Sequence, residues 1–167
     1  MIDIRRVTVD DWQRLRDVRL LSLQDAPDAF GSTYQREAAF DEATWRERAG
    51  SRAYFFAVDG DQVVGLSAGV GAADYLQPDE RLLMSVYVLP AHRGSGVLDA
   101  LVAAVADWAC SDGGLVLQLD VGVRNPRAKR AYERCGFVST GRLWNLERDP
   151  SIVEETLRLD LRNGSGS

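Results

Sequence analysis

Hydrophobic and polar positions along the chain follow two periods, and these periods predict the order of its elements. Residues 97–109 have the apolar spacing of a helix with one buried face, seen at Val97, Leu98, Leu101, Val102, Val105 and Trp108. A short apolar run at 86–88 precedes this helix, and a glycine-containing turn, Arg93 to Gly96, lies between them. The pattern therefore predicts a strand, a turn and a helix, with the turn at the helix N-terminus.

The rest of the chain gives strands and helices in a definite order. Alternating apolar residues predict strands at 2–4, 54–58, 63–70, 82–88, 115–123, 137–146 and 154–161. Helical spacing predicts a helix that Thr8 or Asp10 caps, with a face of Trp12, Leu15, Val18 and Leu21, and a second one from Asp41 through Ala49. A helix between strands 82–88 and 115–123 is the kind of connection that gives parallel pairing, whereas the other neighbours read as antiparallel.

The stretch 117–137 predicts a second strand and helix of special interest. Leu117, Leu119 and Val121 alternate as a strand. Asn125 is then expected at the N-cap, Pro126 at the first helical position and Gly136 just past the helix end. Tyr132 lies seven residues after Asn125, nearly two turns on, so both side chains can face the same side.

Composition limits the class of protein. The 167 residues, 46% hydrophobic and 27% charged, are typical of one globular domain, expected over 1–162. The segment 163–167, NGSGS, has linker composition and is expected to be a disordered tail or a cloning remnant. A net charge of −5 argues against nucleic acid as a partner. The charged start and the lack of a long apolar segment predict a cytoplasmic protein without membrane contact.

Cysteine and histidine content point away from disulfides and metals. Cys110 and Cys135 are too few for a disulfide framework and are expected to be buried, reduced thiols. His92 is the single histidine, so no metal site is expected.

The turn at 93–96 has a chemistry of its own. The first N–H groups of a helix lack intrahelical acceptors and attract anions, and Gly94 and Gly96 can take positive φ so that a phosphate approaches the backbone. Arg93 adds a cation beside it. The residues that follow the turn exclude two other phosphate-binding motifs, the Walker loop and the dinucleotide fingerprint. The remaining alternative is a tight turn that uses glycine for geometry alone.

Taken together, the two stretches resemble the GNAT superfamily of acyl-CoA-dependent N-acetyltransferases. The turn matches the V-x-P-x-x-R-G-x-G pyrophosphate loop of that family, and Asn125, Ala128, Tyr132, Gly136 and Phe137 match its second CoA-contacting motif. The resemblance implies an α/β (α+β) GNAT fold: a mixed, mostly antiparallel sheet of about seven strands, flanked by about four helices and splayed between the fourth and fifth strands. Leu98 stands where the family usually has Gly or Ala, so its side chain either narrows the phosphate cradle or points into the core.

The same resemblance implies the sites. Acetyl-CoA is the expected co-substrate, bound by Val86, Tyr87, Val88, Arg93, Gly94, Ser95, Gly96, Val97, Leu98, Asn125 and Tyr132. Tyr132 matches the family tyrosine that acts as general acid, and backbone N–H groups at 86–88 match the donors that polarise the carbonyl. Asn125 is alternatively only a helix cap, and Arg93 only a surface arginine.

Asp120 is the candidate base. It alternates away from the apolar set of its strand, so it lies on the other face of the sheet, near the splayed strand ends. It also occupies the place of the catalytic Glu in the N-terminal acetyltransferases of bacterial ribosomal proteins, and its shorter side chain favours a water relay. The alternative is a solvated or salt-bridged carboxylate; Glu37, Glu80 and Asp149 are weaker candidates for the base.

The expected activity is transfer of an acetyl group to a primary amine of a small molecule. Acetylation of a protein N-terminus or lysine, and acyl-CoA sensing without catalysis, are the alternatives. Loops at 26–40, 71–80 and 146–153 are expected to determine the acceptor, and four residues of the first are predicted to contact it: Phe30, Ser32, Thr33 and Tyr34. The alternative is a packed connector in which Phe30 and Tyr34 anchor the loop in the core. A homodimer through exposed aromatics such as Trp144 is a further expectation.

Overall fold

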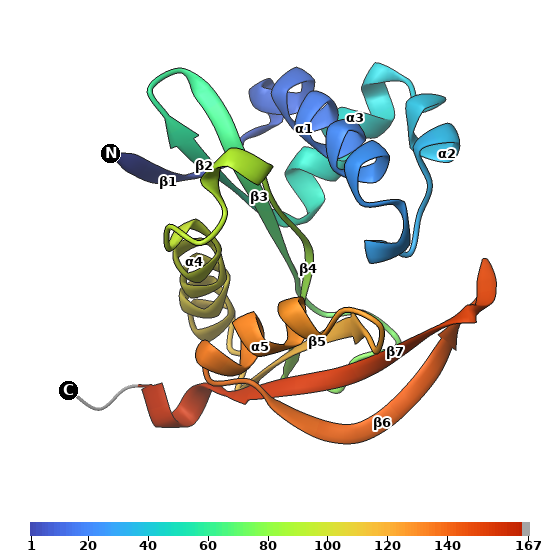
Figure 1. Ribbon diagram of the computed structural model, residues 1–167. Helices are drawn as coiled ribbons and strands as arrows, with labels where there is room; N and C mark the ends of the chain where they lie inside the picture. The colour runs from blue at the N-terminus through green and yellow to red at the C-terminus, as the bar shows by residue number, and fades with distance from the viewer. Residues whose placement is uncertain (165–167) are drawn as a thin grey trace.

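The computed structural model describes residues 1–164, which form one seven-stranded sheet with helices on both faces (Figure 1). The strands are β1 (Ile2–Arg6), β2 (Ala53–Asp59), β3 (Gln62–Val70), β4 (Glu80–Val88), β5 (Val116–Gly122), β6 (Val138–Leu146) and β7 (Asp149–Asp160). The α-helices are α1 (Trp12–Asp25), α2 (Tyr34–Ala38), α3 (Glu42–Ser51), α4 (Val97–Ser111) and α5 (Pro126–Arg134). Four 3-10 turns complete the order: η1 (Val9–Asp11), η2 (Pro27–Ala29), η3 (Pro90–His92) and η4 (Leu161–Gly164).

The strand order is β1-β2-β3-β4-β5-β7-β6, and among these neighbours only β4 and β5 run parallel. The predicted fold class, strand number and parallel pair are therefore confirmed. The α4 crossover explains the parallel pair, because a chain that returns over one face re-enters the sheet in its original direction.

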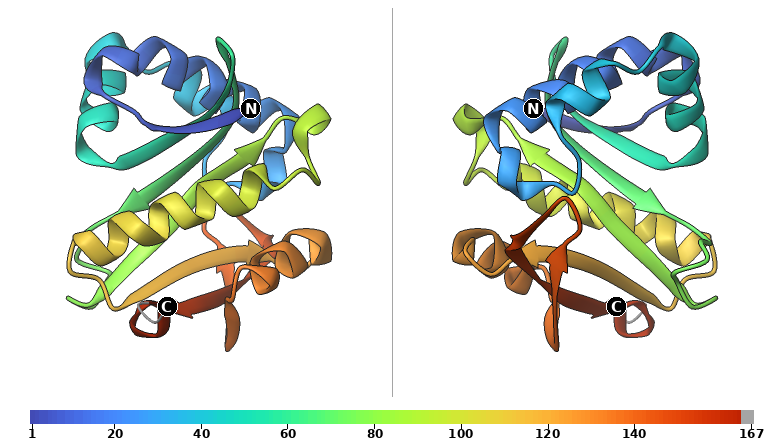
Figure 2. Two further views of the ribbon diagram at one scale, coloured as in Figure 1. Left: turned by 90° about the vertical axis from the view of Figure 1, so that its left-hand side faces the viewer. Right: turned by 90° about the vertical axis from the view of Figure 1, so that its right-hand side faces the viewer.

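Two sides of the sheet carry separate cores. On one face of β1–β4, Phe56, Leu66 and Tyr87 pack with residues of α1 and α3. On the other face, α4 packs against β2, β3 and β4, with Ala57 and Val64 among its contacts (Figure 2). Phe56 and Ala57 are consecutive, so the alternation of a strand is what divides the apolar residues between the two layers.

The sheet opens between its fourth and fifth strands. β4 and β5 pair only at Glu80↔Val116, Arg81↔Leu117 and Leu82↔Gln118, and beyond Leu82 the two strands separate. The predicted splay is thus confirmed. It opens a common space beside the middle of β4 and the middle of β5.

Several caps match the sequence prediction. Thr8 caps η1 in a reciprocal box with Asp11, the Asp41 carboxylate accepts from Thr44 N–H at 2.9 Å, and the Asn125 amide oxygen accepts from Ala128 N–H at 3.1 Å. Each cap lies where the chain passes from extended to helical backbone, because a short polar side chain there satisfies an otherwise unpaired N–H.

Other expectations need correction. Residues 34–38, read as loop, form α2, whose N-cap is Thr33. Leu21 is 43% exposed, so it does not belong to the buried face of α1. Cys110 is exposed and Cys135 is half-buried, so neither is the fully buried thiol expected.

Only the first two residues of the predicted disordered tail, 163 and 164, are among the described residues. Residues 163 and 164 belong to the helical turn η4 where disorder was expected, and the remainder of 163–167 lies outside the described residues. No helix within residues 1–164 combines the length and the apolar character needed to cross a bilayer.

Candidate functional site

A cavity of about 420 Å³ lies where the sheet splays. Its walls come from the middle of β4, from β5, β6 and β7, from Tyr132 on α5, and from the loop that follows α1. Tyr75 and Leu76, from the connection between β3 and β4, also line it. The space therefore collects residues from two of the loops expected to determine the acceptor.

Asp120 lies on the cavity side of β5, as the alternation of that strand predicts. Its Oδ1 accepts hydrogen bonds from Thr156 Oγ1 at 2.6 Å and from Trp144 Nε1 at 3.2 Å. Thr156 is the register partner of Asp120 on the adjacent strand β7, and Trp144 reaches Asp120 from β6, one strand further along the sheet. These contacts hold the carboxylate in one orientation toward the cavity.

Glu154 is a second carboxylate in the same cavity, and sequence reasoning missed it. It is the register partner of Gly122 on β5 and of Trp144 on β6, and only 9% of its surface is exposed. Burial, and then the negative charge of Asp120, raises the pKa of Glu154 to about 7, against a smaller opposing effect of Arg148. Its neighbour Glu155 points to the other side, where Lys129 pairs with it at 2.9 Å.

Only the pairing of β7 with β5 and β6 reveals Glu154 as a site residue. In the sequence it precedes a second glutamate, and the alternation of one strand cannot tell which of the two faces the splay.

Tyr132 reaches the cavity from α5. Its ring packs edge-on against Phe137, with ring centroids 6.0 Å apart, and belongs to the core beneath β5. Burial raises the pKa of the Tyr132 hydroxyl far above its ordinary value, so the group carries its proton at neutral pH. A neutral, protonated phenol is suited to donate a proton rather than to accept one.

β4 is bulged at the edge of the cavity. Its register with β3 moves from Tyr87↔Leu66 to Met84↔Ala68, and Ser85 has a positive φ of 55°. A bulge leaves an extra residue outside the ladder, and a non-glycine residue at positive φ is strained. Ser85 and Val86 both line the cavity. Tyr87 and Val88 keep regular partners on β3. Within the predicted 86–88 segment, the backbone outside the ladder is therefore that of the first residue, Val86.

The glycine turn adopts the backbone that the sequence predicts. Gly94 and Gly96 have φ of 74° and 87°, and a Cβ added to either would point into open space. The first α4 bond joins Ala100 N–H to the Gly96 carbonyl, so the three preceding amides have no acceptor within the helix. Ser95 Oγ donates to the His92 carbonyl and braces the turn.

Arg93 points back into the protein. Its Nε donates to the Val88 carbonyl and its Nη2 to Asp25 Oδ2, both at 2.9 Å, and Tyr87 donates to the same Asp25 oxygen. In this arrangement the Arg93 guanidinium is hydrogen-bonded to β4 and α1, and the turn presents backbone N–H groups.

Leu98 packs against two of the apolar clusters, so its side chain points to the core instead of the turn. Val97 is buried beside it. Cys135 Sγ donates to Asp99 Oδ1 at 3.4 Å and thereby connects the first turn of α4 to the end of α5; burial, assisted by Asp99, raises the pKa of the thiol to about 11. The two motifs found in the sequence are therefore in contact.

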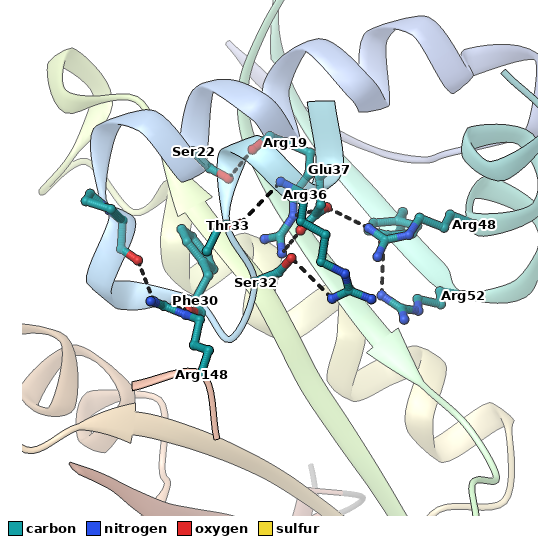
Figure 3. A network of polar contacts seen from close by, with 12 residues as sticks. Arg19, Ser22, Phe30, Ser32, Thr33, Arg36, Glu37, Arg48, Arg52 and Arg148 are labelled. Atoms are coloured by element: carbon teal, nitrogen blue, oxygen red, sulfur yellow. Dashed lines mark hydrogen bonds and ion pairs between the residues drawn. The ribbon is translucent and has the colours of Figure 1, made fainter. Parts of the chain in front are cut away.

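The loop after α1 divides its predicted substrate residues between two surroundings. Phe30 is buried, lines the cavity and stacks under Arg19, whose Cζ lies 4.8 Å from the ring centroid. Ser32 and Thr33 instead accept hydrogen bonds from Arg36 (Figure 3). Tyr34 lies with Thr33 beside a separate hollow near α1. Phe30 alone of the four reaches the cavity within the described residues, so the other three fit the packed-connector alternative.

Arg148, in the β6–β7 turn, donates to the carbonyls of Pro27 and Phe30 at 2.8 and 2.9 Å. Figure 2 shows this hairpin tip directly beneath the loop that follows α1. The third loop expected to affect the acceptor therefore holds the first in place through Arg148.

The weaker carboxylate candidates have structural partners. Glu37 is fully buried between Arg19 and Arg48, Glu80 accepts from Gln77 N–H and Gln118, and Asp149 caps Ser151. Trp144, expected to be exposed, is half-buried and lines the cavity. The homodimer stays a prediction.

Comparison with known proteins identifies relatives over most of the chain. The Acetyltransferase (GNAT) family model matches residues 15–137. An aminoglycoside N(6')-acetyltransferase type 1 of Stenotrophomonas maltophilia is 31% identical over 144 residues, which cover 84% of this chain and 88% of the relative. Streptothricin acetyltransferase of Streptomyces lavendulae is 38% identical over 116 residues, which cover 69% of this chain and 56% of that protein.

An N-acetyltransferase of Mycobacterium tuberculosis is 36% identical over 74 residues, 43% of this chain, and there the match spans only 47%, about half, of the relative's length. Solved structures share the fold: a GNAT-family acetyltransferase from Streptococcus pneumoniae has a TM-score of 0.79 at 16% identity, covering 95% of this chain and 98% of that one. The yncA structure from Salmonella typhimurium, which contains acetyl-CoA as its cofactor, has a TM-score of 0.76 at 18% identity over 96% and 94%.

Proposed function

Because the chain belongs to the GNAT acetyltransferase family, we propose that it transfers an acetyl group from acetyl-CoA to a primary amine of a small molecule. The observation that carries the proposal is the cavity at the splay, where Tyr132, the bulge at Ser85 and the carboxylate of Asp120 line one space. Two relatives are named for the acetylation of aminoglycosides and of streptothricin, and these names support a small-molecule acceptor. We propose residues 1–162 as the catalytic domain.

The glycine turn fits the pyrophosphate of CoA. Gly94 and Gly96 have open space where a side chain would stand, and the three amides at the start of α4 lack helical acceptors. A side chain at either glycine would fill that space and would oppose the positive φ. We therefore propose that the backbone at 94–98 holds the phosphates, with Asn125 contributing at most its amide NH₂ because its oxygen caps α5.

Bound acetyl-CoA would supply the acetyl thioester. The unpaired backbone at the β4 bulge, Ser85 to Val86, is proposed to donate a hydrogen bond to the carbonyl oxygen of the acetyl group, and one such donor is worth about 2.7–4 kcal/mol in acyl transfer. Tyr132 is proposed to hold the proton that the departing thiolate needs, because it lines the cavity and a tyrosine hydroxyl is protonated at neutral pH.

The acceptor amine must reach the cavity and lose a proton before it attacks. An alkyl ammonium has a pKa of about 10.4, so a carboxylate has to draw the proton away at neutral pH. Asp120, which its two donors aim into the cavity, is proposed to meet the ammonium and draw the proton away, directly or through one water.

Thiol release from acetyl-CoA, screened over small amines and peptides, tests this function. Turnover with small amines supports the proposal. Turnover confined to peptides would identify a protein acetyltransferase, and tight CoA binding without any acceptor-dependent turnover would identify a sensor.

Tyr132→Phe then tests the site. It should lower kcat by about 100- to 10,000-fold while calorimetry shows an unchanged Kd for CoA, because the ring stays and only the proton donor is lost. Gly96→Val should instead raise the Kd for CoA, and Gly60→Val, which places the same side chain on another open, positive-φ glycine in the β2–β3 turn, is its control for backbone strain. Equal kcat for Tyr132→Phe and wild type would remove Tyr132 from the mechanism.

A further inference from the structure

Glu154 has a position in the cavity that the proposed function does not yet use. Glu154 and Thr156 are two residues apart on β7, so both face the same side as Asp120, the register partner of Thr156. Trp144 lies opposite Glu154 on β6 and donates to Asp120. The two carboxylates are therefore diagonal neighbours on adjacent strands, and both line the cavity that Tyr132 reaches.

The two carboxylates differ in what surrounds them. Asp120 is held through Oδ1 by Thr156 and Trp144. Glu154 is more buried than Asp120. Within residues 1–164, burial and the charge of Asp120 raise the pKa of Glu154, the charge of Arg148 lowers it, and no hydrogen bond contributes. One carboxylate is thus anchored as an acceptor of protein donors, and its neighbour has its oxygens free for a proton.

The groups that face Glu154 from each packed element are few. Asp120 faces it from β5, Trp144 from β6, Arg148 from the β6–β7 turn and Tyr132 from α5, and Arg142 and Arg19 line more of the same cavity. Arg148 is engaged with two backbone carbonyls, and Arg19 pairs with Glu37 at 3.0 Å. Arg148 and Arg19 are therefore directed to other partners, and within residues 1–164 none of the three arginines forms an ion pair with Glu154.

We infer that Glu154 is the final acceptor of the proton that the amine loses, while Asp120 binds the ammonium as a fixed negative charge. In this step one N–H bond of the ammonium breaks, its electron pair stays on nitrogen for attack on the acetyl carbon, and the proton forms an O–H bond on Glu154. The transfer passes directly or through one water, and Asp120 stays ionised throughout. This division of roles between paired carboxylates follows the rule that neighbours with different surroundings act as different acid–base groups.

The inference rests on the proposed function and specifies its acceptor. The cavity favours an amine that is cationic in solution, because an ammonium would be the counter-charge of Asp120 and would supply the proton that Glu154 takes. A neutral, weakly basic amine such as an aniline would gain from neither carboxylate. An aliphatic amine should therefore be the better substrate.

The test is the pH dependence of kcat/KM for the best aliphatic amine found in the screen. With Glu154 as the acceptor, the wild type should rise to a plateau from about pH 7. Glu154→Gln should lose about 100- to 10,000-fold at pH 7 and then gain tenfold per pH unit toward the pKa of the amine, because only the free amine can react. Asp120→Asn should mainly raise KM and keep an ascending limb.

Glu47→Gln is the matched control, since it removes the same charge from an exposed position on α3, outside the cavity and outside the loops expected to determine the acceptor. It should keep the wild-type profile. An ascending limb near pH 7 that persists in Glu154→Gln and disappears in Asp120→Asn would overturn the inference and make Asp120 the final acceptor. Absence of turnover by the wild-type enzyme with every amine, despite CoA binding, would instead overturn the proposed function.

Discussion

Two buried glutamates, Glu37 on α2 and Glu154 on β7, have opposite electrostatic surroundings. Glu37 accepts from Arg19 at 3.1 and 3.0 Å and from Arg48 at 2.7 Å (Figure 3). Burial alone would raise the pKa of Glu37, but hydrogen bonds and positive charge from its partners outweigh burial and lower it. Glu154 faces Asp120, and its pKa rises to about 7.

The comparison shows that burial alone does not assign a role to a carboxylate. A buried anion between two cations is a structural element, here one that connects α1, α2 and α3. A buried carboxyl group beside a second carboxylate changes its protonation near neutral pH, which is what a general base requires. Arg148 connects the two regions, because it faces Glu154 and also holds the loop that carries Phe30.

The largest effect on stability is expected for Glu37→Gln. It leaves Arg19 buried without its counter-charge, and breaking a buried pair in this way costs about 3–5 kcal/mol. Urea denaturation of the variant and the wild type measures the difference. Glu42→Gln, which removes an exposed partner of Arg46 from α3, is the control and should change little. A loss no greater than that of the control would show that Glu37 is not the structural half of the comparison.

Glu154→Gln should have the opposite effect at alkaline pH. The pKa of Glu154 is higher in the folded protein than its ordinary 4.5, so the unfolding free energy of the wild type falls as pH rises from about 4.5 to about 7. Glutamine cannot ionise, so the unfolding free energy of the variant does not fall over this pH range for that reason. At pH 8 the variant should be more stable than the wild type, by on the order of 3 kcal/mol at most.

Denaturant midpoints at pH 4 and pH 8 measure this difference, and the gain should nearly vanish at pH 4, below the ordinary pKa of 4.5. A variant less stable than the wild type at both pH values would show that Glu154 is stabilised as an anion, as Glu37 is.

The smallest effect is expected for Arg148→Gln. Removing this positive charge should raise the pKa of Glu154 further. The ascending limb of kcat/KM should then move to higher pH by about half a pH unit. Arg148→Lys keeps the charge while it changes the contacts with Pro27 and Phe30, so it should return the limb toward its original place even where KM stays changed. A limb that moves equally in both variants would mean that the loop position, not the charge, acts on Glu154.

The sequence by itself determined the order of the elements, the two motifs and the face of Asp120. These depend on local rules: the period of apolar residues, the caps at Asp41 and Asn125, and the positive φ that Gly94 and Gly96 adopt. The membership of the family follows from the same local motifs.

Only the tertiary structure decided which side chains share the cavity. The bulge at Ser85 depends on how β4 pairs with β3, and the site role of Glu154 depends on its register with β5 and β6. Arg93 turns away from the phosphate side because Asp25, far away in sequence, lies within reach of its guanidinium. Glu37 and Glu154 are the same residue type in the sequence, and their pKa values move in opposite directions because the charges around each are brought there by folding.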